Sequence, residues 1–144
     1  MVRIKFLAAA GAAACLGVSC APAPAAETSV QSRSPARVEA TADATIKKVT
    51  LTPKAAERLG IKTDEVRVDP SGRWIVPYTS VLYDLKGGTW VYVNIEPMTF
   101  VREAVRIDTI RGENVYLKYG PPSGTKVLAT GVAQIFGTEV GVGH

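Results

Sequence analysis

The sequence predicts a mainly β fold, a small antiparallel β-barrel or sandwich that contains one short helix. Three observations lead to this expectation. From residue 46 onward, short runs of alternating apolar and polar residues recur, turn-forming Gly, Pro, Asn and Asp residues separate them, and one segment carries a full set of helix boundary signals. The chain has 144 residues, of which 47% are hydrophobic, so it can form one globular domain.

The N-terminal residues 1–19 have the features of a signal peptide. Arg3 and Lys5 come before an uncharged, Ala-rich run that extends from Phe6 to Val18. This run is shorter than the about 20 residues that a membrane-spanning helix needs. Small residues then precede Cys20, a pattern that resembles the lipobox of bacterial lipoproteins. We therefore expect cleavage before Cys20 and acylation of its thiol and new amino group.

Lipidation of Cys20 would place the protein in the cell envelope as a membrane-anchored lipoprotein that faces the periplasm. Two or three acyl chains hold a protein firmly, whereas one holds it reversibly. Ala21, and not Asp, follows the cysteine; in a bacterium with two membranes, the sorting pattern of lipoproteins then implies the outer membrane. The alternative is an ordinary signal peptide that is cleaved after Ala25 or Ala26. In the lipoprotein interpretation Cys15 is removed, so no disulfide can form.

Residues 20–44 are expected to form the lipidated cysteine and a flexible tether. This stretch is rich in Ala and Ser, contains Pro22, Pro24 and Pro35, and has no aromatic residue. Such a composition buries too little apolar surface to offset the entropy of ordering the chain. The alternative is an extra strand around Val38.

The β domain is expected to span residues 45–144, and its one short helix lies near the start. Thr52-Pro53 is a typical helix beginning, with Thr as the N-cap and Pro at the first helical position, and Gly60 is the matching end. Residues 61–68 are then extended. Their alternation slips near Asp64-Glu65, where we expect a β-bulge.

Turn signals separate the strands that follow. The sequence Asp69-Pro70-Ser71-Gly72 fits a type I turn, and Pro77 ends the next strand because it lacks the N–H group that a central strand must donate. The clearest strand spans residues 89–94, in which we expect Trp90 to be a core anchor. Its alternation places on one face Trp90, Tyr92 and Asn94, and on the other Val91 and Val93.

The same alternation continues between residues 100 and 107. It predicts one face with Val101, Glu103, Val105 and Ile107, and an opposite face with Phe100, Arg102, Ala104 and Arg106. Further strands are expected at residues 115–119 and 127–129, with turns at 111–114 and 120–124 and a final helical turn at 132–136.

The residue types that catalysis and metal binding need are scarce. His144, at the end of the chain, is the only His, and there is no Walker loop, Rossmann fingerprint, nucleophile elbow or His–Glu zinc motif. Asp64, Glu65 and Asp69 can be interpreted as a cation site, but a solvated strand end explains them more simply. No nucleophile and base pair can be assembled, so we expect no enzyme activity, no catalytic residues, no metal and no cofactor.

The charge is too weak to indicate a nucleic-acid partner, and we expect none. The formal net charge of +4 falls to +2 once Arg3 and Lys5 leave with the signal peptide, and the remaining basic residues are spread along the chain. We interpret the Trp and Tyr residues of the β domain as core or cross-strand pairs, rather than as a stacking platform for bases.

Four segments resemble, in the same order, the periplasmic adaptor subunits (membrane fusion proteins) of tripartite efflux systems, notably those that serve RND pumps. Residues 75–83 (IVPYTSVLY) are similar to the family's Val-Pro-x-x-Ala-Val run, and residues 87–93 (GGTWVYV) to its Gly-x-x-x-Val-Tyr-Val strand. Residues 100–105 (FVREAV) resemble Phe-x-Arg-Arg-x-Val with Glu103 in place of the second Arg. Residues 120–131 fit the closing Gly-rich run, with Pro at the usual Leu position.

The resemblance implies a membrane-proximal domain. Residues 49–63 resemble the segment that precedes the α-hairpin in long adaptors, whose membrane-proximal domain is built from both chain ends. On this resemblance, the chain is expected to join the two ends directly through residues 69–72, without the helical hairpin that in long adaptors spans from the pump to the outer-membrane channel.

The function that follows is a lipid-anchored, adaptor-like binding module that docks on an RND-type pump or a full-length adaptor without bridging to the channel. Arg102 and Arg106 are the expected partner-binding residues, because they share a face and guanidinium groups bind carboxylates bidentately; a solvated face is the alternative. Two other function classes stay open. One is a structural or interaction lipoprotein of the envelope that uses the same β fold for an unrelated partner, and the other is a small-molecule or metal carrier.

Overall fold

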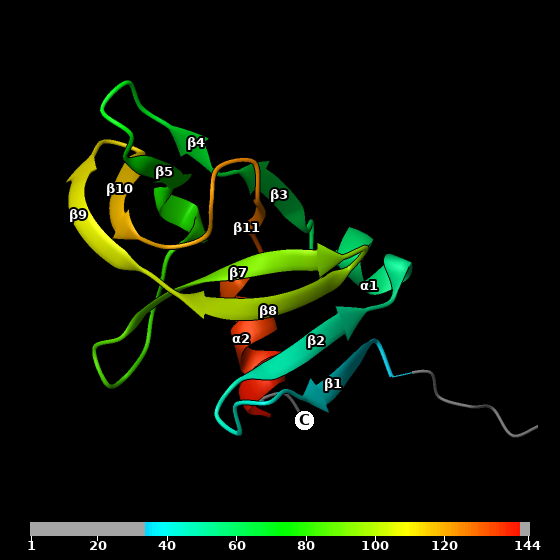
Figure 1. Cartoon of the computed structure of the whole chain (residues 1–144). Coiled ribbons are helices and arrows are strands. Elements are labelled where there is room, and N and C mark those ends of the chain that lie inside the picture. The colour runs from blue at the N-terminus through cyan, green and yellow to red at the C-terminus, as the bar shows by residue number, and fades with distance from the viewer. Residues whose placement is uncertain (1–33, 142–144) are drawn as a thin grey trace, which may run out of the picture. The chain divides into compact units, whose positions relative to one another are not determined.

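The computed structural model describes residues 34–141 (Figure 1). The predicted signal peptide, Cys20 and His144 lie outside the described residues. The fold is mainly β, with two antiparallel sheets that do not close into a barrel. This confirms the fold class and, of its two forms, excludes the closed barrel.

The larger sheet has seven strands. Its path follows the order β1 (Ala36–Ala40), β2 (Lys47–Leu51), β8 (Thr99–Ala104), β7 (Thr89–Glu96), β11 (Lys126–Thr130) and β3 (Lys62–Glu65), and β6 (Leu82–Tyr83) pairs with β7. The smaller sheet has the order β4 (Arg67–Val68), β5 (Trp74–Pro77), β10 (Asn114–Tyr119) and β9 (Arg106–Arg111). Three helical segments complete the fold: α1 (Pro53–Arg58), the 3₁₀ turn η1 (Tyr78–Ser80) and α2 (Val132–Val140).

Strand β1 corrects the predicted boundary between tether and domain. It lies within residues 20–44, which we expected to be flexible, and it pairs antiparallel with β2 so that Val38 is opposite Val49. The alternative of a strand around Val38 is therefore the one that the structure supports, and the folded part begins before residue 45. We predicted the tether from amino-acid composition alone. Composition gives no information on pairing with a distant strand, and here the short, polar β1 is ordered by its pairing with the partly buried strand β2.

The helix boundaries follow from local chemistry. Thr52 caps α1, since its Oγ1 accepts a hydrogen bond of 3.2 Å from the backbone N–H of Ala55, and Pro53 is the first helical residue. Gly60 follows with φ of 62°, a conformation that favours glycine. Near the C-terminus, the expected helical turn at 132–136 extends into the longer helix α2, which ends at Val140.

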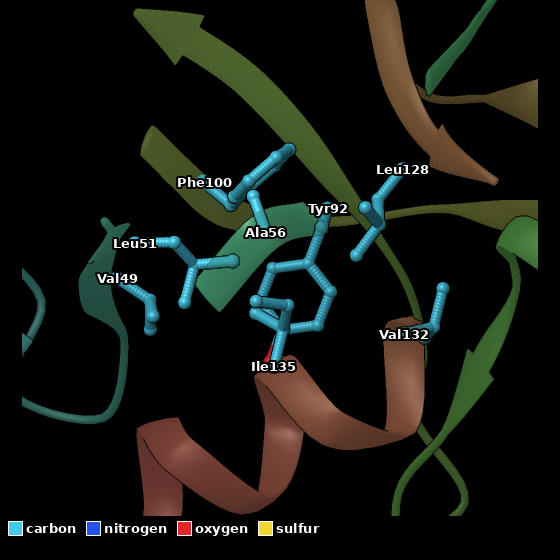
Figure 2. Close-up of a cluster of buried hydrophobic side chains, with 8 residues drawn as sticks. All are labelled: Val49, Leu51, Ala56, Tyr92, Phe100, Leu128, Val132 and Ile135. Carbon is cyan, nitrogen blue, oxygen red and sulfur yellow. The ribbon is translucent and has the colours of Figure 1, made fainter. Parts of the chain in front are cut away.

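Two apolar clusters place the larger sheet in the middle of the folded part. One cluster lies between this sheet and the helices (Figure 2) and consists of Val49, Leu51, Ala56, Tyr92, Phe100, Leu128, Val132 and Ile135. The other joins the larger sheet to the smaller one and consists of Val66, Val76, Val91, Val105, Val115, Leu117 and Val127. Neighbours such as Val91 and Tyr92 are both fully buried, because β7 carries apolar side chains on both of its faces.

The chain crosses between the two sheets four times in the described residues, and two of these crossings lie at buried valines. The expected extended segment 61–68 is interrupted at Val66, which separates β3 from β4. Likewise Val105 separates β8 in the larger sheet from β9 in the smaller one, and its backbone N–H donates to the carbonyl of Thr89 at 2.9 Å. The continuous strand expected over residues 100–107 is therefore two strands in two sheets.

Candidate docking surface and the buried charge network

Arg102 lies inside the folded part. Its side chain is only 10% exposed, and Nε lies 2.9 Å from Oε1 of Glu139 on α2. A second guanidinium nitrogen donates to the backbone carbonyl of Thr45. The guanidinium also stacks over the ring of Trp90, 4.7 Å from its centroid. Internal partners thus hold the guanidinium that we expected to bind another protein.

Glu139 is the acidic centre of this network. Its side chain is 2% exposed, Oε1 accepts a hydrogen bond of 3.0 Å from the N–H of Lys47, and Oε2 accepts one of 2.5 Å from the hydroxyl of Tyr92. Burial, together with the hydrogen bond to Glu139, raises the pKa of Tyr92 above its usual range, so Tyr92 remains a neutral donor. A buried carboxylate needs such partners because an isolated charge in an apolar core is costly.

The network fastens α2 to the larger sheet. Its members come from α2, β7, β8 and the start of β2, all of which border the apolar cluster of Figure 2. Sequence reasoning missed Glu139. A usable signal was its spacing: Val132, Ile135 and Glu139 are three and four residues apart, which places them on one face of a helix. An acid on the apolar face of a helix indicates a buried partner.

Trp90 has a different role from the expected core anchor. It is half-buried, while Tyr92 on the same face is fully buried. The indole Nε1 donates to Oδ2 of Asp84 at 2.8 Å, and Oδ1 of Asp84 accepts from the N–H groups of Lys86 and Gly88. The indole hydrogen bond, followed by that of Gly88, lowers the pKa of Asp84. Trp90 therefore fixes the loop between β6 and β7 from the edge of the core.

The structure separates the two arginines that alternation placed together. Arg102 is in β8 of the larger sheet, and Arg106 is in β9 of the smaller one. Arg106 is exposed and lines an open groove that it shares with Trp90, Ala104 and Val105. The expectation of one shared face is therefore wrong, because the crossover at Val105 breaks the alternation. A docking role for Arg106 stays a prediction.

The three acids considered as a cation site do not form a cluster. Asp64 and Glu65 are exposed on the edge strand β3, whereas Asp69 forms an ion pair with Arg73 at 2.8 Å in the turn before β5. Within residues 34–141, no group of three or more potential ligands can hold a metal ion.

Comparison with known proteins does not assign this chain to a family. No family model, no curated protein and no solved structure matches this chain. Among the helices that the structure describes, none has the length and apolar character needed to cross a membrane.

Proposed function

We propose that the protein is a lipid-anchored, adaptor-like binding module of an RND-type efflux system, which docks on the pump or on a full-length adaptor. One observation carries the proposal. The first and last parts of the described chain pack together, because α2 lies against the larger sheet beside β2. Ile135 shares an apolar cluster with Val49 and Leu51, and Glu139 accepts a hydrogen bond from the N–H of Lys47. The resemblance to adaptors implies such a domain, built from both chain ends.

The short connection between β4 and β5 supports the idea of a domain closed on itself. Asp69 accepts hydrogen bonds from the N–H groups of Ser71 and Arg73 through Oδ1, and the N–H of Gly72 donates to the carbonyl of Asp69. The resemblance implies that long adaptors insert at this turn the parts that reach the outer-membrane channel. The proposed function is accordingly docking without bridging.

Arg106 and its groove are the proposed contact region. Arg106 is exposed, and the half-buried Trp90 lies beside it along the groove. Arginine and tryptophan are the residue types that most often dominate the binding energy of protein interfaces. Membrane anchorage through Cys20 would hold this region near membrane-bound partners and raise its effective concentration there.

Site-specific photocrosslinking in native membranes tests the proposal. A photoreactive amino acid is placed at Arg106, and a matched control carries it at Lys126, an exposed position on β11. We expect crosslinks to a transporter or an adaptor from position 106, and far fewer from position 126. Crosslinks from position 106 to an envelope polymer or to an unrelated lipoprotein would instead support the alternative function.

A further inference from the structure

The side of the smaller sheet that faces away from the larger sheet carries an ordered group of arginines. Val76, Val115 and Leu117 point into the core on the inner side. The residues between them alternate to the other side, where Arg67 is paired with Ile75, and Ile75 with Tyr116. We call this side the arginine face and define it by Arg67, Arg73, Arg111, Asn114 and Tyr116.

The ring of Tyr116 and the side-chain amide of Asn114 hold the guanidinium groups in place. Arg73 and Arg111 both lie over the ring of Tyr116, at 4.7 and 5.6 Å from its centroid. Arg67 donates from Nη2 to Oδ1 of Asn114 at 2.7 Å. Asn114 is the direct cross-strand partner of Arg111 in the register of the sheet, so Arg67 and Arg111 flank the same part of β10.

The three arginines differ in their charge balance. Arg73 is neutralised by Asp69 at 2.8 Å and by Asp108 at 3.5 Å. In contrast, no carboxylate of residues 34–141 lies within 4.0 Å of Arg67 or Arg111, and both are exposed. The face thus presents two pre-positioned positive charges without an acidic partner in the described part of the chain.

We propose that the arginine face is a docking site for a protein segment that carries two closely spaced carboxylates. Each guanidinium can bind a carboxylate through two parallel hydrogen bonds. The hydrogen bond to Asn114 already restricts Arg67, and the contact with the ring of Tyr116 already restricts Arg111, so less side-chain entropy is lost on binding. The half-buried side chains of Ile75 and Tyr116 lie between the two arginines and offer apolar surface that the side chains of a bound peptide can contact. This site is separate from the groove at Arg106 and does not depend on which protein carries the acids.

Fluorescence anisotropy with a labelled hexaglutamate peptide tests the site on the full chain in detergent. We expect the wild type to bind the peptide and the double variant Arg67→Gln/Arg111→Gln to bind about tenfold more weakly or less. The control Lys86→Gln/Lys126→Gln removes the same charge from two exposed lysines elsewhere and should bind like the wild type. Tyr116→Leu keeps the charge but removes the ring that orders Arg111, so it should bind several-fold more weakly.

Three results of the peptide titrations would overturn the proposal. They are no binding by the wild type, equal binding by the Arg67/Arg111 variant, and equal weakening in the lysine control, which would mean that the peptide senses net charge alone. Circular dichroism of each variant establishes that the fold is retained. Displacement of the peptide by pyrophosphate at a far lower concentration than by unlabelled hexaglutamate would assign the site to phosphate and would also contradict a carboxylate site.

Discussion

Replacing Glu139 by glutamine probes the buried network that holds α2 on the larger sheet. The substitution keeps the shape of the side chain and leaves an oxygen for the N–H of Lys47, but it removes the negative charge beside Arg102. The guanidinium of Arg102 is then a nearly buried cation whose other contacts are the carbonyl of Thr45 and the rings of Trp90 and Phe136.

The expected cost follows from this burial. Removing one partner of a buried ion pair destabilises a protein by about 3–5 kcal/mol, and the contacts that Arg102 keeps favour the lower end of that range, about 3 kcal/mol. Domains of this size unfold with about 5–15 kcal/mol, so Glu139→Gln should lose a large part of its stability. The loss is expected as a lower urea midpoint with an unchanged slope.

Urea unfolding followed by tryptophan fluorescence measures the effect, because Trp74 and Trp90 both lie in strands. The control Glu57→Gln changes an exposed glutamate on α1 and should alter the free energy of unfolding by less than about 0.5 kcal/mol. The double variant Arg102→Met/Glu139→Leu removes both charges and should recover much of the loss. A midpoint for Glu139→Gln equal to that of the wild type would refute the buried ion pair.

Three further predictions concern the core, pH and the anchor. Gly131→Ala should destabilise the domain by about 1–3 kcal/mol in thermal unfolding, because Gly131 has φ of 94° and an added Cβ would lie 2.3 Å from Cδ1 of Ile61; an unchanged melting temperature would contradict this packing. The lowered pKa of Asp84 means that its hydrogen bond with Trp90 stabilises the fold above the ordinary pKa of 3.8 and that this contribution is lost as the pH falls through the lower, folded-state value; Asp84→Asn should flatten this acid limb of the stability curve, and an identical acid limb would rule the contribution out. Cys20→Ser should release the protein from the membrane fraction. If cells are fed a palmitate analogue and the wild-type protein does not become labelled, lipidation is contradicted.

Local signals were enough to predict much of the secondary structure. The Thr52-Pro53 and Gly60 signals gave α1, whose cap is formed as expected. Strand β7 came from its alternation, and the turn at residues 69–72 came from its residue types. These features depend on neighbours within a few residues, which is the range that propensity and periodicity describe.

Long-range features were missed for a physical reason. Strand β1 is ordered by pairing with β2, and the crossover at Val105 is set by two sheets that must both bury this valine. The partners Glu139 and Arg102 are far apart in the sequence, so neither reveals by itself that it is buried. Periodicity therefore assigned Arg102 to an exposed face that the tertiary structure covers.

Affinity purification from native membranes, followed by mass spectrometry, tests the proposed docking function most directly. The tagged wild type is compared with Cys20→Ser, which keeps the β domain but removes the proposed anchor. The proposal predicts that an RND-type pump or a full-length adaptor is recovered with the wild type and is depleted with Cys20→Ser. Reproducible recovery of envelope polymer or of unrelated lipoproteins, without a transporter or adaptor, would contradict it.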